Sequence, residues 1–236
     1  MKYKNIESSK EVIEALSKIG EAITSDLYLE DILKLIVTIT AEIMKSKVCS
    51  IMLLDPKKKT LAIKATQSIS REYINKNPLK LGEGIAGKVA LKNSYVYVPN
   101  ILEEDTYIHK EIARKEGLVS LLCVPLHVKG RVIGVLNLYT SEPHNFNDYE
   151  ISILKAVADQ AAIVIENYRL IVETKVIKEE LETRKVLEKA KGILMEDYSL
   201  SEEKAFKKIQ KFAMDRRKPI REVAEAIVMS YEMQKS

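Results

Sequence analysis

Basic side chains gather at two places near the end of the chain, and their chemistry is the first clue to function. They are Arg184, Lys189 and Lys191 in one helical stretch, and Arg216, Arg217 and Lys218 at a turn. Cations grouped on one side of a small domain are what contact with a phosphate backbone requires. Residues 176–236 include 14 Lys and Arg and 12 Asp and Glu, so their net charge is small. The placement of the charges, not their sum, favours nucleic-acid binding.

Residues suited to catalysis or metal binding do not form a set. Cys49 and Cys123 each lie in an apolar, strand-like run without a neighbouring thiol, which indicates buried side chains in a reducing cytoplasm. His109 has no companion at metal-ligand spacing. We therefore predict no catalytic residue and no metal site, and the sequence requires no cofactor. No apolar run approaches the roughly 20 residues of a spanning helix, so no membrane partner is expected.

Glycine and proline divide the chain that must position these residues. Seven of eight glycines and five of six prolines occur by Pro143, and only Gly192 and Pro219 follow. The first part is therefore predicted to be rich in turns and the second almost continuously helical.

The first part combines helices with short strands. Apolar residues at helical spacing predict two helices, the first resting on Val12, Leu16, Ile19 and Ile23, the second ending near Ile43. Strand-like runs cover residues 48–54, 60–66, 95–98, 119–128 and 131–139, with Lys129-Gly130 as a hairpin turn between the last two. Strands paired through short turns and flanked by helices predict an α+β domain on a mainly antiparallel sheet.

A long helix is predicted over residues 149–196. Its apolar residues recur in steps of three and four: Ile151, Leu154, Ala158, Ala161, Ile165, Tyr168 and Val172. This heptad-like spacing predicts a seam through which two copies of the chain pair as a coiled coil. The alternative is a helix that packs only on its own sheet, which accounts poorly for the stretch after Tyr168.

Two shorter helices are predicted to follow. Ser199 with Glu202 three positions later matches a capping box, and Pro219 suits the first turn of the final helix. Each helix has a single apolar face, so with the end of the long helix they should pack as a three-helix bundle.

The first part resembles the GAF domain family. The resemblance rests on Leu81–Val89, on Ser120–Leu126 running on to Ile133–Leu138, and on Phe146 with Glu150. It covers residues 9–169 and implies a sensory domain with a pocket for a small ligand, bordered by Tyr97, Tyr107 and His109. The Lys and Asp of the family's cyclic-nucleotide motif are missing, which argues against that ligand. Some stand-alone members reduce methionine sulfoxide with paired accessible thiols, which Cys49 and Cys123 do not provide.

The last part resembles the ANTAR family. The resemblance rests on Arg184–Glu196, Ser201–Phe206, Ala213-Met214 and Val223–Ile227. It implies a dimeric domain that binds paired RNA hairpins in nascent transcripts and so prevents a terminator from forming. Bound RNA loops need close backbone approach and stacking surfaces, which Gly192, Tyr198 and the plane of Arg217 can offer.

The sequence thus predicts an α+β GAF domain (9–169), a coiled-coil-like helix (149–196) and an all-α ANTAR domain (179–236). The expected function is signal-responsive transcription antitermination in the cytoplasm, with RNA, a second copy of the chain and a small effector as partners. The alternative is a GAF sensor that acts through protein–protein contacts without binding RNA.

Overall fold

Short polar turns between strand-forming runs build a six-stranded antiparallel sheet in the order β3-β2-β1-β6-β5-β4. The structure, a computed structural model, describes residues 14, 17–18, 20, 28–68 and 70–235. The strands are β1 (Val48–Asp55), β2 (Thr60–Thr66), β3 (Leu79–Lys80), β4 (Val96–Val98), β5 (Leu121–Val128) and β6 (Arg131–Tyr139). The residues of the first predicted helix, Val12, Leu16, Ile19 and Ile23, lie outside the described residues.

The turn between β5 and β6 forms as its dipeptide predicts. Lys129 and Gly130 both have positive φ, at 50° and 76°, which matches the twist of the two strands that they join. The five predicted strands are present, with ends shifted by one or two residues, and β3 is an additional short strand. The predicted fold class, an α+β domain followed by helices, is confirmed.

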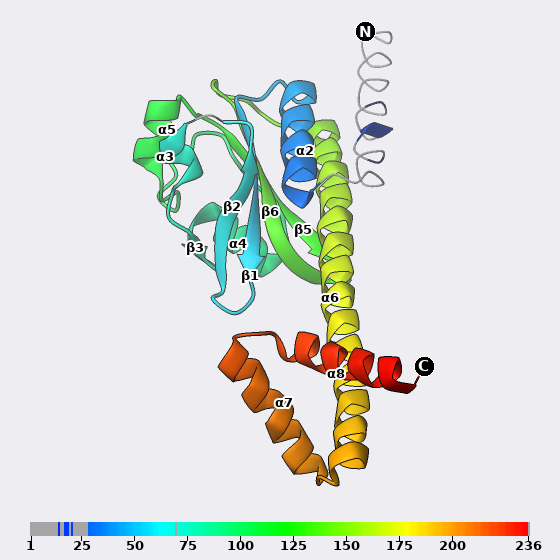
Figure 1. Cartoon of the computed structure of the whole chain (residues 1–236). Coiled ribbons are helices and arrows are strands. Elements are labelled where there is room, and N and C mark those ends of the chain that lie inside the picture. Colours follow the sequence, from blue (N-terminus) through cyan, green and yellow to red (C-terminus); the bar gives the residue numbers. More distant parts are fainter. Residues whose placement is uncertain (1–13, 15–16, 19, 21–27, 69, 236) are drawn as a thin grey trace. The chain divides into compact units, whose positions relative to one another are not determined.

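Helices cover both faces of the sheet (Figure 1). One face carries α2 (Leu29–Ile43) and the first turns of α6, a single helix from Asp148 to Tyr198. The other face carries α3 (Arg71–Ile74), α4 (Gly84–Lys92) and α5 (Lys110–Glu116). Because side chains alternate along a strand, each face has its own apolar core.

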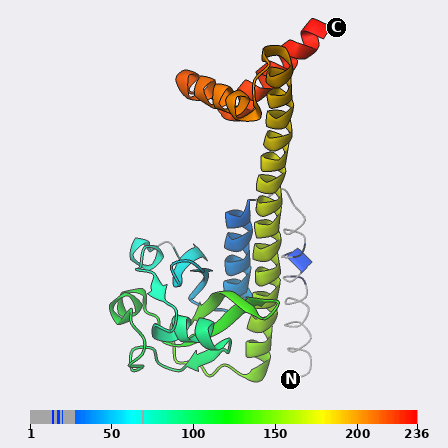
Figure 2. The same ribbon diagram turned by 90° about the horizontal axis from the view of Figure 1, so that it is seen from below.

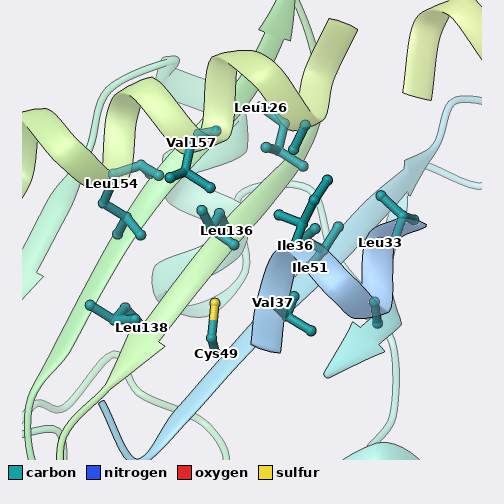
Figure 3. Packing of buried hydrophobic residues seen from close by; sticks show 14 of the residues in the cluster. Leu33, Ile36, Val37, Cys49, Ile51, Leu126, Leu136, Leu138, Leu154 and Val157 are labelled. Atoms are coloured by element: carbon teal, nitrogen blue, oxygen red, sulfur yellow. The ribbon is translucent and has the colours of Figure 1, made fainter. Parts of the chain in front are cut away.

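The beginning of α6 is part of the first core. Figure 3 shows Leu154 and Val157 facing Leu126 and Leu136 of the sheet, beside Ile36 of α2. The seam predicted for a second copy is therefore corrected for five of its residues, which are at most 9% exposed inside this core: Ile151, Leu154, Ala158, Ala161 and Ile165. Steps of three and four place side chains on one helix face, and that face packs equally well on a sheet or on another helix. Tyr168 and Val172 are 37% and 44% exposed.

The end of α6 packs with α7 (Glu202–Arg216) and α8 (Ile220–Lys235), as Figure 2 shows. Their shared core consists of small and branched side chains: Ala190, Leu194, Ala205, Ile209, Ala213, Val223 and Ala224. These residues belong to a second unit, which begins at Arg169. Among the described residues, no helix is long and apolar enough to cross a bilayer.

The start of α7 differs from the prediction. Ser201, not Ser199, caps this helix, because its side chain accepts a hydrogen bond from the Lys204 N–H. Ser199 lies at the end of α6 with a φ of 49°, a left-handed conformation that stops a helix. Glu202 is thereby free to pair with α6 instead of closing a capping box.

Candidate nucleic-acid interface and ligand cavity

The turn between α7 and α8 presents three of the predicted cations. Arg217 has a φ of 52° and ends α7, with its N–H donating to the carbonyl of Met214. Arg216 lies with its guanidinium carbon 5.5 Å from the centre of the Phe212 ring, and Lys218 Nζ lies 2.8 Å from Glu222 Oε2. Among the described residues neither Arg217 nor the exposed Arg184 has an ion-pair partner, so both charges are available to an anion.

Lys191 is placed differently from the expectation that it contacts RNA. The residue is only 8% exposed, and its Nζ lies 2.8 Å from Glu188 Oε1 and 2.7 Å from Glu202 Oε1. Hydrogen bonds to these two carboxylates raise the pKa of Lys191. The geometry corrects the prediction to a structural role, in which Lys191 ties α6 to the start of α7. Lys189 stays exposed, with its Nζ 2.6 Å from Glu232 Oε1 of α8.

Gly192 is an exposed position inside α6, within the last two turns of that helix. A Cβ added to it would meet no heavy atom within 4 Å, so internal packing does not require glycine there. Glycine in a helix costs about 1 kcal/mol relative to alanine. The open backbone at this position therefore remains available for close approach by a partner.

A hollow of about 500 Å³ opens between the end of α6, α7 and α8. Three aromatic residues line it, Tyr198, Phe212 and Tyr231, and the first two are 60% and 52% exposed. Lys208 and Lys218 line it as well, with Lys208 Nζ 4.0 Å from the centre of the Tyr198 ring. We call this the bundle hollow. Exposed aromatic faces beside ammonium groups suit the stacking of unpaired bases together with phosphate contact.

The bundle hollow brings together only part of the predicted set. It contains Tyr198 and Lys218, whereas sequence reasoning missed Lys208, Phe212 and Tyr231. Phe212 stands three residues after the buried Ile209, so its spacing is that of a core residue. Only the aromatic character of Phe212 and Tyr198 next to several lysines distinguishes this helix face in the sequence.

A second, small cavity lies in the first unit, on the sheet face that carries α3, α4 and α5. Tyr107 and His109, two of the residues expected at a ligand pocket, line it together with Lys76, Asn137 and Tyr139. We call it the sheet cavity. Its polar groups come from β6 and from the segments before β3 and α5, which are far apart in the chain.

Tyr97 lies elsewhere, and this part of the prediction is wrong. Its side chain packs on the core formed by α2 and α6, and its ring meets the Phe146 ring edge-on at 5.5 Å. The Tyr97 hydroxyl donates to the carbonyl of His144 at 2.7 Å. Strand alternation is the reason: Val96 and Val98 face α3, α4 and α5, so Tyr97 must face the other way.

The two cysteines lie on opposite faces of the sheet. Cys49 belongs to the core under α2 and α6, and Cys123 to the core under α3, α4 and α5. Burial raises the pKa of both thiols, which disfavours the thiolate. Neither position suits thiol–disulfide chemistry. In the part of the chain that the structure describes, no three His, Cys, Asp or Glu side chains form a group that could hold a metal ion.

Comparisons with known proteins agree with this division of the chain. A family model described as "GAF domain" matches residues 27–166, and one described as "ANTAR domain" matches residues 176–228. The methyl sulfide methyltransferase-associated sensor of Methanosarcina acetivorans is 29% identical over 164 residues, which are 67% of this chain and 16% of that protein. The transcriptional regulatory protein PdtaR of Mycobacterium tuberculosis is 46% identical over 56 residues, 24% of this chain and 27% of that protein. The chain thus spans well under a third of either relative.

Solved structures resemble the first unit. The GAF domain of a phosphoenolpyruvate-protein phosphotransferase from Coxiella burnetii superposes with a TM-score of 0.63 at 24% identity. The match covers 70% of this chain and 98% of that domain, so it supports the fold of the first unit.

Proposed function

Because this chain belongs to the GAF domain family and carries an ANTAR domain behind its GAF domain, we propose that it is a signal-responsive RNA-binding antiterminator. A GAF sensor joined to an ANTAR domain makes a sensor-regulated antitermination regulator at the level of domain types. The proposal adds that the ANTAR domain binds RNA hairpins, that two chains act together, and that the GAF domain responds to a small ligand.

The observation that carries the RNA-binding half is the bundle hollow. Tyr198 and Phe212 expose more than half of their surface there, although burial would remove this apolar area from water. Ammonium groups of Lys208 and Lys218 lie at the same hollow. Unpaired loop bases offer flat faces to aromatic rings, and their phosphates offer charges to lysines, so an RNA loop satisfies both features. Asp197 and Glu222 also line the hollow, and Glu222 pairs with Lys218, so the Arg184 and Arg217 charges are the ones left for phosphate contact.

We propose that two chains pair through a surface of α6 that differs from the predicted seam. Ile163, Leu170 and Ile177 recur at intervals of seven residues and are 46%, 43% and 63% exposed. Leu181, four residues after Ile177, is 50% exposed. This stripe has the heptad spacing of a coiled-coil seam and is not used by the core of the first unit. We assign the dimer contact to this stripe in place of the five buried seam residues Ile151, Leu154, Ala158, Ala161 and Ile165.

Two paired chains explain how modest contacts suffice. When one ANTAR domain holds the first hairpin of an RNA, the second hairpin is presented to its partner at high effective concentration. A ligand in the GAF domain that alters the pairing of α6 therefore changes the affinity for a two-hairpin RNA more than for a single hairpin.

A mobility-shift titration tests the RNA-binding half. The full chain is titrated into RNA with two short hairpins and into a single-hairpin RNA, each at low and high salt. Wild-type protein is expected to prefer the double hairpin and to weaken as salt rises, because phosphate contacts release counterions. Tyr198→Ala and Arg217→Gln should each weaken binding by about tenfold, equivalent to about 1.4 kcal/mol.

Matched controls separate contact from general effects. Lys178→Gln removes the same charge from an exposed position on α6, and Tyr28→Ala removes an exposed tyrosine from the first unit. Both should bind RNA like the wild type. A protein that still dimerises but forms no RNA complex would contradict the proposal. That result would support the alternative, in which the C-terminal bundle docks a protein.

A further inference from the structure

We propose that the sheet cavity of the GAF domain binds a small hydroxycarboxylate, with the Lys76 ammonium holding the carboxylate and the Asn137 amide holding the hydroxyl. The inference rests on the sensing half of the proposed function and names the chemical class of its ligand. It depends on polar groups that the folded domain buries and leaves without partners.

Asn137 is the strongest of these groups. The residue is 1% exposed near the end of β6, and among the described residues neither its Oδ1 nor its Nδ2 has a hydrogen-bond partner. Buried polar groups are normally satisfied, because an unpaired one loses its bonds to water and gains none. The amide offers one acceptor and two donors side by side. A hydroxyl group matches it, since a hydroxyl can donate to Oδ1 and accept from Nδ2.

Lys76 supplies the positive charge. Its Nζ lies 4.3 Å from the centre of the Tyr73 ring, and the Tyr73 hydroxyl is itself engaged with Ser50 Oγ at 2.9 Å. No carboxylate within the described part of the chain forms an ion pair with Lys76. Burial of this ammonium lowers the pKa of Lys76 to about 8, so the group is still charged at neutral pH. Lys76 is half-buried as a residue, and a cation that lines a cavity without an ion-pair partner favours an anionic ligand.

His109 adds one further hydrogen-bonding atom. Its Nε2 is buried and has no partner among the described residues. Burial and the nearby Lys76 charge lower the pKa of His109, which keeps the ring neutral at pH 7. A neutral ring adds no second positive charge, so Lys76 is the cation that lines the cavity, while the Glu83 carboxylate acts on His109 from nearby. A single lining cation suits one carboxylate group of a small ligand.

The dimensions of the cavity restrict the ligand to a few heavy atoms. The enclosed space is about 20 Å³, which is room for a water-sized group. Ile108, which is 48% exposed, is among the lining residues. The proposal requires this side chain to rotate outward, so that a ligand with two or three carbon atoms can enter. The remaining walls are apolar: Met52, Leu79, Ile85 and Leu121.

Isothermal titration calorimetry of the full chain tests the site with four probes. Glycolate and L-lactate carry both required groups, acetate lacks the hydroxyl, and 1,2-propanediol lacks the carboxylate. Glycolate or L-lactate should bind at least about tenfold more tightly than acetate or the diol. Lys76→Met and Asn137→Leu should each abolish the measurable heat, while Lys64→Met, at an exposed position on β2, should bind like the wild type.

Thermal unfolding keeps the test decisive if a variant is damaged. Asn137→Leu replaces an unsatisfied amide by an apolar side chain of similar size, so the variant should be at least as stable as the wild type and still lose the ligand. Unchanged binding in both Lys76→Met and Asn137→Leu would overturn the site, as would failure of all four probes to bind.

The calorimetry involves no RNA, so the two proposals fail separately. Binding of a hydroxycarboxylate without any RNA complex would support this site and contradict the RNA-binding half. RNA binding by a protein that takes up none of the probes would overturn this site and leave the RNA-binding half intact.

Discussion

Replacement of Gly192 by alanine separates the stability of the second unit from its affinity for RNA. The residue is exposed in α6, and the added methyl group would meet no heavy atom within 4 Å. Exchange of a helical glycine for alanine without steric conflict stabilises a protein by about 0.5–1 kcal/mol. For a unit of this size, about 1 kcal/mol corresponds to a rise in Tm of roughly 4–8 °C.

The same methyl group should weaken RNA binding. If RNA approaches the α6 backbone at Gly192, the Cβ occupies the space that a base or sugar needs, and affinity should fall by about tenfold or more. Calorimetric unfolding of the full chain and the two-hairpin mobility shift give the two readings. A more stable protein that binds RNA less tightly is the predicted combination.

A matched control distinguishes lost contact from a stiffer helix. Thr183→Ala also raises helix propensity in α6, and it removes a methyl group and a hydroxyl that donates to the carbonyl of Glu179. It should bind RNA like the wild type. If Gly192→Ala is more stable and binds RNA as tightly as the wild type, Gly192 has no part in RNA contact and the assignment is refuted.

Three further predictions concern other parts of the chain. Lys191→Met should lower the Tm of the second unit, because it removes the ion pairs to Glu188 and Glu202. The decrease in Tm, measured by scanning calorimetry, should be smaller at high salt. Leu170→Glu combined with Ile177→Glu should convert dimers to monomers, as measured by light scattering, and leave the unfolding of the first unit unchanged. Dimers that persist in this variant would exclude the exposed α6 stripe as the dimer contact. Lys76 has a pKa of about 8 when folded, against 10.5 for an ordinary lysine. Between these pH values the unfolded chain binds more protons, so the free energy of unfolding should rise with pH. The rise should reach about 1–3 kcal/mol in urea titrations, and a Lys76→Met protein with the same slope would disprove it.

Much of the fold follows from local sequence. The Lys129-Gly130 pair determines a hairpin, because two consecutive positive φ angles match the twist of paired strands. The absence of glycine and proline between Pro143 and Gly192 permits one long helix, and α6 indeed runs without a break from Asp148 to Tyr198. These signals depend on neighbouring residues alone, so they can be read without knowledge of tertiary contacts.

The partner of a helix face does not follow from spacing. Ile151 and Leu154 have the periodicity of a coiled coil, yet their partners are the sheet and α2. The exposed stripe through Leu170 and Ile177 has the same interval on another face, and only burial distinguishes the two. Similarly, Lys191 resembles its basic neighbours in the sequence, whereas its burial depends on Glu202 from the next helix.

The sheet cavity shows the same limit. Lys76 and Asn137 are separated by some sixty residues and carry no motif, so nothing in the sequence marks them as neighbours. Asn137 stands out because, among the described residues, its buried amide has no hydrogen-bond partner, which only the folded structure reveals. Tyr97 was also expected at this cavity. It lies in β4, where successive side chains point to opposite faces of the sheet, and its own side chain points to the face covered by α2 and α6.

Native mass spectrometry of the full chain with a two-hairpin RNA tests whether two chains act together on RNA. We expect a complex of two chains with one RNA, which single-hairpin RNA does not form at the same protein concentration. A complex of one chain per two-hairpin RNA would contradict action as a dimer, and the absence of any complex would contradict RNA binding itself.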